Sequence, residues 1–254
     1  IKDNLIIAIE EPNTIQISNI VKIEHSKKLV LIPGLIDIRV TSKDPGLAHA
    51  ENLESLLKSS AKSGITTLVC LPNTLPILDD AAIVNSLKHR SESFGLSRLL
   101  MYGAASKGLS GEKLAELGLL SEAGVVGFSN GNTSIYNAML MQRVLSYSSI
   151  LSLPVIQHAD IPELSFETDA TAGEISTRLG LQGSPSITES MLIERDVQLL
   201  KMTGGQYHVS HISTKQGIQS VIKAKEEGLR ISCDTSPPYM LLNDFSLMNY
   251  DTRF

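Results

Sequence analysis

The sequence lacks the features that mark disulfide-rich, membrane-spanning and secreted proteins. Its only two cysteines, Cys70 and Cys233, lie far apart in apolar segments. Two isolated cysteines exclude a disulfide framework, and we expect both to be free, buried thiols in a reducing compartment. No apolar run approaches the roughly 18 residues that span a bilayer, and no signal peptide is visible. We therefore expect a cytoplasmic protein with no membrane partner.

Positive charge is not in excess either. The chain has 22 Lys and Arg against 27 Asp and Glu, which gives a formal net charge of -5. The basic residues are scattered along the sequence instead of forming a stripe, so we expect no nucleic-acid partner. With 254 residues, of which 42% are hydrophobic and 19% charged, the chain has the composition of a globular protein with a sizeable core.

Strand-like and helical segments alternate from residue 29 onward. Helices are predicted where apolar residues recur at helical spacing and a glycine such as Gly64, Gly124 or Gly228 ends the pattern. The predicted strands are 29–40, 65–71, 99–105, 125–128, 155–158, 207–212 and 229–233. The predicted helices are 52–63, 80–94, 110–123, 136–147, 188–202 and 215–227. This alternation predicts an α/β fold with parallel strands joined by helical crossovers.

The number of strands determines the expected domain organisation. The seven predicted strands are one fewer than a closed (β/α)8 TIM-type barrel requires, so we expect the eighth strand beyond Phe254. Residues 29–254 would form this barrel, incomplete at its C-terminus. Residues 1–28 contain short apolar clusters separated by polar breaks, and they are predicted to be part of a small β-domain that precedes the barrel.

The stretch from Leu29 to Gly46, LVLIPGLIDIRVTSKDPG, organises the rest of the chain. Because side chains alternate along a strand, Asp37, Arg39 and Thr41 should share one face and the intervening aliphatic residues the other. Such a strand can present polar groups at its carboxyl end. One hypothesis is that Asp37 forms a salt bridge with Arg39.

This stretch resembles the first strand of dihydroorotases and related cyclic-amide hydrolases. Those proteins read Pro-Gly-Leu-Ile-Asp-x-His-x-His-x-Arg-x-Pro-Gly, and both histidines bind metal. The chain retains the frame but has Arg39, Thr41 and Lys43 in place of the two histidines and the arginine. The resemblance implies an amidohydrolase-type (β/α)8 barrel flanked by a β-sandwich, of which residues 1–28 would be a part.

Two residues are predicted to bind substrate through this resemblance. The loop Pro72-Asn73-Thr74 is similar to a family loop in which the Asn helps to hold the substrate carboxylate. Lys43 could attract the same carboxylate, although as a point charge without the bidentate fork of an arginine.

The resemblance also identifies what remains of a metal site. His158 and His211 lie where the family has metal-binding histidines. Asn130 and Gly131 replace acidic residues, and Pro238 and Tyr239 replace a pair of histidines. An amide is a weak ligand, and an arginine cannot lose its proton to become one. His158 and His211 are therefore the residual metal candidates, and we expect either no metal or at most one zinc ion, where the family norm is zinc.

Two functions follow from the resemblance. Active relatives use a metal-bridging hydroxide to interconvert carbamoyl aspartate and dihydroorotate in pyrimidine biosynthesis. With so few ligands left, the favoured interpretation is a non-catalytic homologue that is a structural partner of aspartate carbamoyltransferase. The alternative is an active dihydroorotase with a reduced or altered metal site. The sequence leaves open whether the chain forms a homo-oligomer, and it identifies no catalytic residue.

Overall fold

The structure, a computed structural model, describes residues 5–9, 11 and 30–250. The chain divides into two compact units, Ile1–Pro33 and Gly34–Phe254. The predicted β-domain of residues 1–28 falls largely outside the described residues and stays a prediction. The larger unit contains all the helices and strands considered below.

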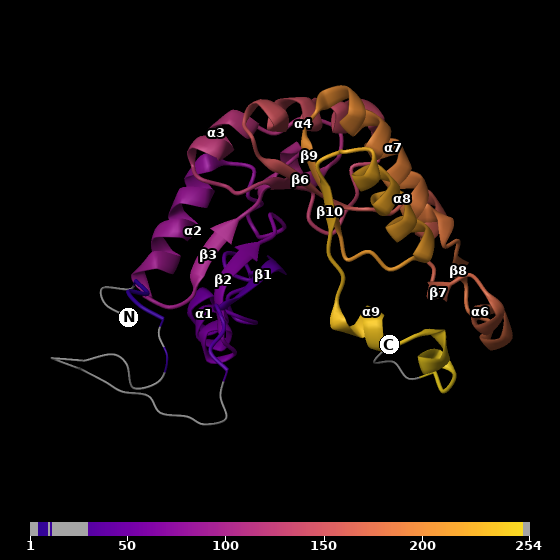
Figure 1. Ribbon diagram of the computed structural model, residues 1–254, viewed down its shortest axis with the longest axis horizontal. Helices are drawn as coiled ribbons and strands as arrows, with labels where there is room; N and C mark the ends of the chain where they lie inside the picture. Colours follow the sequence, from indigo (N-terminus) through magenta and orange to yellow (C-terminus); the bar gives the residue numbers. More distant parts are fainter. Residues whose placement is uncertain (1–4, 10, 12–29, 251–254) are drawn as a thin grey trace. The chain divides into compact units, whose positions relative to one another are not determined.

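Seven parallel strand positions form the centre of the larger unit (Figure 1). Neighbours in the chain are also neighbours in space, and every pair is parallel. β3 and β4 are separated by Tyr102 alone and together fill one position. The strands are β1 (Leu35–Val40), β2 (Ile65–Cys70), β3 (Arg98–Met101), β4 (Gly103–Ala104), β5 (Phe128–Ser129), β6 (Pro154–His158), β9 (Gln206–Ser210) and β10 (Ile231–Cys233). The seven predicted strands are confirmed, while the short pair β7 (Ala170–Thr171) and β8 (Gly183–Ser184) was not predicted.

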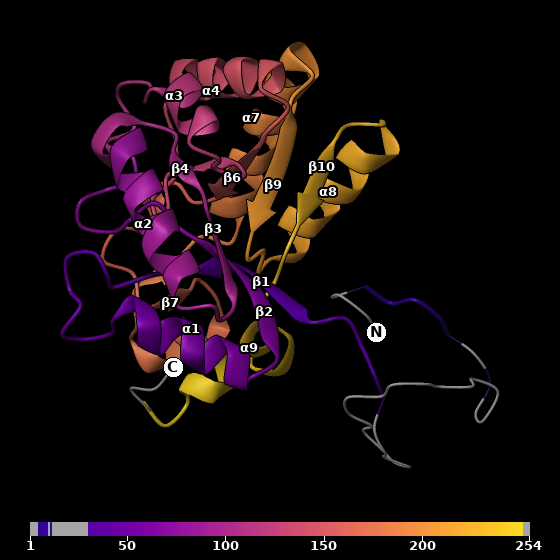
Figure 2. The same cartoon turned by 90° about the vertical axis from the view of Figure 1, so that its left-hand side faces the viewer.

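Helices connect these strands and cover their outer face (Figures 1 and 2). Side chains of Asn52, Asp80, Asn137 and Thr214 cap the amino ends of four of them, as expected for these residue types. The helices are α1 (Leu53–Lys62), α2 (Ala81–Ser93), α3 (Leu117–Glu122), α4 (Ala138–Ile150), α5 (Pro162–Ser165), α6 (Glu174–Leu179), α7 (Ile187–Thr203), α8 (Lys215–Glu226) and α9 (Pro237–Leu241), with 3-10 turns η1 (Lys107–Leu109) and η2 (Asp244–Leu247).

The helix predicted over 110–123 is much shorter in the structure. Ala115 N–H donates to the carbonyl of Ala105 at 3.2 Å, and Lys107 N–H donates to that of Lys113 at 2.9 Å. These bonds hold the chain before α3 against the end of β4, so its backbone groups are not available for helix formation.

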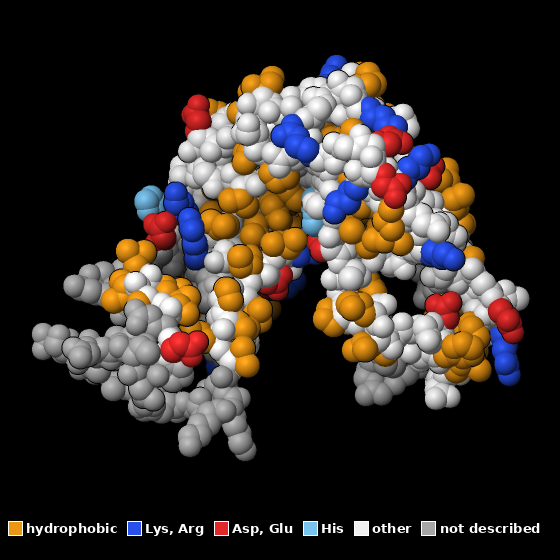
Figure 3. Space-filling view, in the orientation of Figure 1, with side chains coloured by type: hydrophobic (Ala, Val, Ile, Leu, Met, Phe, Trp, Pro, Cys, Tyr) orange, Lys and Arg blue, Asp and Glu red, His pale blue; other side chains and the backbone are white. Residues whose placement is uncertain are grey.

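The strands separate two apolar clusters. The larger one lies between strands and helices and includes Leu68, Met101, Phe128 and Tyr207. The smaller one faces the interior of the strand array, and its buried members are Val69, Leu71, Tyr102 and Ile156. Figure 3 shows hydrophobic side chains gathered on this concave side. Side-chain alternation along each strand produces the two layers.

β1 departs from the strict alternation that the sequence predicts. Ile38 packs against the interior cluster, whereas Val40 packs against the helix-side cluster. The pairing of β1 with β2 shifts register between Asp37 and Val40. The two aliphatic residues therefore lie on opposite sides of the strand, which corrects the prediction that they share a face.

Both cysteines are free, as predicted. Cys70 is fully buried, and burial raises the pKa of its thiol to about 11. Cys233 is only partly buried, so its prediction as a buried thiol is wrong in that respect. Among the described helices, none combines the length and apolar character needed to cross a bilayer.

Candidate functional site

The carboxyl ends of parallel strands meet at one edge, and in barrels of this kind they form the site. His158 ends β6 and His211 follows β9, and the structure brings these two predicted residues together. Their ring centroids are 4.7 Å apart and their planes make an angle of 81°.

Burial lowers the pKa of His158 to about 4. The neighbouring His211 and Arg39 lower this pKa further, whereas the charge of Asp160 raises it. The pKa of His211 is also lowered, first by burial and then by Arg39. The pair is thus uncharged at neutral pH.

Glu189, on α7, fixes the loop that carries His211. This buried carboxylate accepts the backbone N–H groups of Ser213 at 2.8 Å and Thr214 at 2.9 Å, and both hydroxyl groups as well. These groups precede α8, so Glu189 also satisfies free donors at the start of that helix. The backbone after His211 is therefore held in one position.

Asp234, directly after β10, is a site residue that the sequence reasoning missed. Its Oδ1 accepts the backbone N–H of His211 at 2.5 Å, and its Oδ2 lies 2.8 Å from Nε2 of His208. Nδ1 of His208 lies 2.8 Å from the hydroxyl of Ser232. Burial raises the pKa of Asp234, but the hydrogen bonds from His208 and His211 outweigh burial and leave it below its usual range. An acidic residue at the end of a barrel strand was the signal that could have identified it.

Arg39 lies among these groups, on β1. Its backbone N–H donates to Oδ1 of Asp37 at 2.9 Å, and its Nη2 donates to Oδ1 of Asn132 at 2.9 Å. The hypothesis of an Asp37–Arg39 salt bridge is wrong, because the guanidinium extends to the loop after β5 and the carboxylate of Asp37 bonds the backbone instead. Burial lowers the pKa of Arg39, and the charge of Asp234 opposes this effect.

Asn130 and Gly131 occupy the loop after β5. The side chain of Asn130 is buried, accepts from the backbone and hydroxyl of Ser106 at 3.2 and 2.9 Å, and donates to the carbonyl of Leu109. Gly131 has a φ of 68°, and a Cβ there would lie 3.2 Å from Cβ of Asn73. Asn130 is therefore engaged with the η1 loop, and Asn73 packs where a side chain at position 131 would lie.

The predicted substrate-binding residues have different surroundings. Asn73 is partly buried beside the β5 loop, and its Oδ1 has no hydrogen-bond partner among the described residues. Lys43 is exposed and lines neither of the cavities at this edge. Its neighbour Asp44 is buried and accepts two hydrogen bonds from Arg90, at 2.9 and 2.6 Å. Both substrate-binding roles stay predictions.

Two cavities open at this edge, and His158 and Asp160 line both. The larger, about 390 Å³, includes Ser110, Asn132 and Thr133 in its lining. The smaller, about 180 Å³, is bordered by the two site histidines, Glu189 and Tyr239, the last being one of the residues that replace family histidines. Small polar molecules fit cavities of this size.

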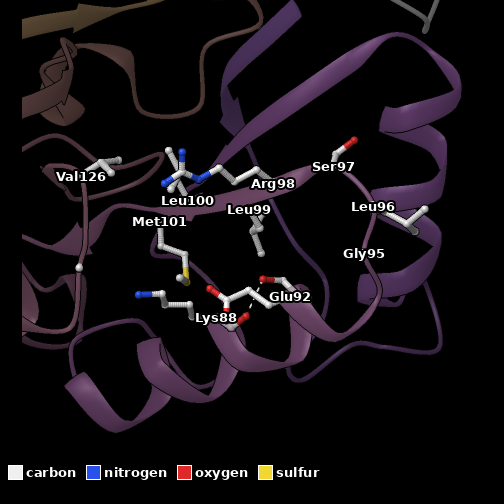
Figure 4. A pocket seen from close by; sticks show the side chains of 12 residues that line it. Lys88, Glu92, Gly95, Leu96, Ser97, Arg98, Leu99, Leu100, Met101 and Val126 are labelled. Carbon is white, nitrogen blue, oxygen red and sulfur yellow. Dashed lines mark hydrogen bonds between the residues drawn. The ribbon is translucent and has the colours of Figure 1, made fainter. Parts of the chain in front are cut away.

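A third cavity, of about 370 Å³, lies elsewhere (Figure 4). Lys88 and Glu92 reach it from α2, while Arg98 and Met101 reach it from β3. The cavity extends along the whole of β3, and none of its lining residues lines either of the cavities beside His158.

The donors at the strand ends do not fit the two-metal site that the resemblance implies. No group of three or more His, Cys, Asp or Glu among the described residues is arranged to hold a metal ion. Catalytic zinc generally needs three protein ligands, and here two imidazoles remain beside a guanidinium. Asp160, which lines both cavities with His158, accepts the hydroxyl of Ser165 at 2.6 Å.

A buried network supports the histidine end of β6. Asp196, on α7, accepts from Tyr207 at 2.8 Å and from Gln157, the residue before His158, at 3.4 Å. Arg195 donates to the same carboxylate at 2.9 and 2.5 Å. Burial raises the pKa of Asp196 to about 6 despite these donors. The network positions β6 and does not face the cavities.

Comparison with known proteins agrees with this architecture. The family model described as dihydro-orotase-like matches residues 28–217. A dihydroorotase from Desulforapulum autotrophicum is 31% identical over 253 residues, covering 100% of this chain and 59% of the relative. One from Geobacter sp. strain M21 is 38% identical, covering 89% and 53% respectively. The chain thus spans about half the length of the curated relatives it matches.

Solved structures show the same fold. L-hydantoinase (dihydropyrimidinase) from Arthrobacter aurescens matches with a TM-score of 0.68 and 20% identity, covering 83% of this chain and 48% of that one. Dihydroorotase from Campylobacter jejuni matches with a TM-score of 0.57 and 14% identity, covering 85% and 57%. These likenesses confirm the predicted α/β fold of the (β/α)8-barrel type.

Proposed function

This chain belongs to the family of dihydroorotase-like proteins, and on that premise we propose that it is a non-catalytic member acting in pyrimidine biosynthesis as a structural partner of aspartate carbamoyltransferase. The observation that carries the proposal is the placement of Arg39. Its cation lies at the strand ends, within electrostatic range of His158 and His211. A guanidinium keeps its proton at working pH and repels a metal ion.

The retained framework supports a structural role. The pair of buried Asp44 with exposed Arg90 and the Asp196 network stabilise the barrel without taking part in the site. A protein that acts in assembly and not in catalysis needs the barrel framework but not the metal ligands. The chain retains residues of the framework and has lost metal ligands, as this role would allow. Cytoplasmic location and any homo-oligomer are further parts of this proposal.

The second candidate is an active dihydroorotase with a reduced or altered metal site. The edge-to-face contact of His158 and His211 favours it, because two imidazoles remain together where ligands are expected. A single zinc ion would require a third donor, and Asp160 is the acid that the linings of the two cavities share. These residues would hold the zinc ion, which would supply Lewis-acid chemistry and activate a water molecule.

Elemental analysis of the purified protein, before and after zinc is added, separates the two candidates. We expect less than about a tenth of an equivalent of zinc in both samples and no cyclisation of carbamoyl aspartate, because the described residues retain fewer than three ligands. About one equivalent of tightly held zinc, together with cyclisation, would establish the alternative.

The partner is tested by size-exclusion chromatography with purified aspartate carbamoyltransferase. We expect the two proteins to elute together as a complex. Separate elution at micromolar concentration would contradict the partner role while leaving the absence of metal untouched.

A further inference from the structure

We propose that Ser232, His208 and Asp234 form a metal-independent nucleophilic centre, in which Ser232 accepts an acyl group from an ester or thioester of a small apolar acid. His208 lies on β9, Ser232 lies on β10 and Asp234 follows it directly. The inference goes beyond the proposed function, because it involves neither a metal ion nor a cyclic amide. A chain without dihydroorotase activity can still carry this separate reaction.

The three side chains are joined by hydrogen bonds through the imidazole ring. Nδ1 of His208 lies 2.8 Å from the hydroxyl of Ser232, and Nε2 lies 2.8 Å from Oδ2 of Asp234. A nucleophile within hydrogen-bond reach of a base, with the base oriented by a third group, is the arrangement that activates serine in hydrolases. The ring is turned so that Nδ1 faces the serine, and either ring nitrogen can accept a proton.

The partners of His208 determine which of its nitrogens carries the proton. An ionised aspartate only accepts hydrogen bonds, so Nε2 of His208 donates to Asp234. In the neutral ring Nδ1 is then an acceptor, and the hydroxyl of Ser232 donates to it. Asp234 is itself held in place, because its Oδ1 accepts the backbone N–H of His211 at 2.5 Å. His208 therefore has the tautomer and the orientation that allow it to take the serine proton.

The parallel strands place this centre on the concave side of the strand array. Ser232 lies opposite His208 in the register of β9 and β10. Ile231 and Cys233, which flank Ser232, pack against the helix-side cluster, so alternation along the strand directs Ser232 to the concave side. Ser232 is exposed, whereas His208 is partly buried. The nucleophile is therefore accessible to a substrate while its base is fixed.

The neighbouring side chains favour an apolar acyl group. Ile156, on β6, lies opposite His208 on the other side of β9. It belongs to the apolar cluster of the concave side, whose other buried members are Val69, Leu71 and Tyr102. An acyl chain of a few carbon atoms attached to Ser232 can pack toward this cluster and remove apolar surface from water.

Two donors near the centre are available for the oxyanion that forms when a serine attacks an acyl carbon. The hydroxyl of Ser210 is buried without a hydrogen-bond partner among the described residues, and alternation places it on the same face of β9 as His208. Nη1 of Arg39 also lacks a partner there, and Arg39 is close enough to Asp234 for their charges to interact. Donors that are already in place stabilise such an oxyanion effectively.

The reaction balances with water as its only co-reactant. Oγ of Ser232 forms a bond with the acyl carbon while its proton passes to Nδ1 of His208. The bond from the acyl carbon to the leaving oxygen or sulfur then breaks, and the leaving group takes that proton as an alcohol or thiol. Water attacks the acyl-serine, and His208 transfers a proton from the water to Oγ. The products are a carboxylic acid and an alcohol or thiol.

Reaction of the purified chain with p-nitrophenyl butyrate, at neutral pH and with EDTA to remove metal ions, tests the centre. We expect release of nitrophenol, and mass spectrometry should find a butyryl group on Ser232. Ser232→Ala should abolish this acylation. His208→Gln should slow it by about a hundredfold or more, because the general base is lost.

Ser93→Ala is the matched control, because Ser93 is exposed and its hydroxyl donates to the backbone carbonyl of Arg90 at 2.7 Å. This variant should react like the wild type. Asp234→Asn places an amide beside His208 and no longer fixes the required tautomer, so it should slow acylation by about tenfold or more. It provides a second variant if His208→Gln does not fold.

Equal rates of nitrophenol release by the wild type and Ser232→Ala would overturn the proposal, as would butyryl groups on lysine side chains alone. Acylation of Ser232 at an unchanged rate in His208→Gln would overturn it too, because the serine would then react without its base. These outcomes leave the zinc content and the co-elution with aspartate carbamoyltransferase untouched, so failure here is distinct from failure of the proposed function.

Discussion

His158 and His211 contact each other edge to face, with their ring centroids 4.7 Å apart at an interplanar angle of 81°. Burial lowers the pKa of both, and the adjacent Arg39 lowers it further. The two imidazoles are neutral and lie near the guanidinium cation of Arg39. In a metal site, paired imidazoles would instead bind a metal cation.

Protonation of His158 should couple folding stability to pH. Its folded pKa of about 4 lies below the unfolded value of about 6.5, so the unfolded chain binds the proton more readily. The free energy of unfolding should therefore fall as pH is lowered from about 6.5 to 4, by up to about 3 kcal/mol. Urea denaturation across this range measures the slope.

His158→Gln should reduce that slope, whereas His89→Gln should leave it unchanged because the side chain of His89 is 80% exposed. A titration midpoint of His158 near 6.5, measured by NMR on the folded chain, would contradict the prediction.

Restoring two imidazoles on β1 should create a zinc site. The double substitution Arg39→His and Thr41→His removes the repelling cation and adds two donors to His158 and His211. We expect zinc bound by this variant to rise to about one equivalent or more, measured by elemental analysis. Arg39→Gln combined with Thr41→Gln is the control, since it removes the cation without adding imidazoles. If the control binds as much zinc as the histidine variant, the side chains at positions 39 and 41 do not act as zinc ligands together with His158 and His211.

Gly131→Ala should destabilise the fold more than Gly108→Ala. Both glycines have positive φ, 68° and 61°, so each substitution introduces backbone strain of about 1 kcal/mol. A Cβ at 131 would also lie 3.2 and 3.3 Å from Cβ and Cγ of Asn73, whereas one at 108 meets nothing within 4 Å. We expect the additional cost at 131 to be about 1 kcal/mol in urea denaturation. Equal costs would mean that Asn73 moves aside freely.

Asp44→Asn should destabilise the chain by about 2 kcal/mol, because the buried carboxylate accepts charged hydrogen bonds from Arg90 and the N–H of Leu53. The hydrogen bond from Arg90 lowers the pKa of Asp44, against the effect of burial. Its contribution should therefore be present at neutral pH and be lost as pH falls through the folded pKa. Glu54→Gln breaks the exposed pair with Lys58 and should change the stability by less than about 0.5 kcal/mol. A comparable loss of stability in both variants would show that burial of the Asp44 carboxylate does not strengthen its pair with Arg90.

Much of the fold was predictable because it depends on local chemistry. Apolar strands, helical spacing and capping residues such as Asn52 and Asp80 lie within short stretches of sequence, and the seven strand positions and most helices follow from them. The short helix α3 was mispredicted because hydrogen bonds from distant backbone groups, at Ala105 and Lys107, compete with its helical ones.

The sequence by itself determined the order of strands, the family framework and the identity of the residues at each strand end, including Arg39 in place of a metal-binding histidine. Tertiary structure alone decided how those residues interact. It directed the guanidinium of Arg39 to Asn132, 93 positions away in the chain, and not to Asp37, and it joined Asp234 to His208 and His211. A hydrogen bond depends on distance and direction in space, and sequence spacing fixes those only within a helix or strand.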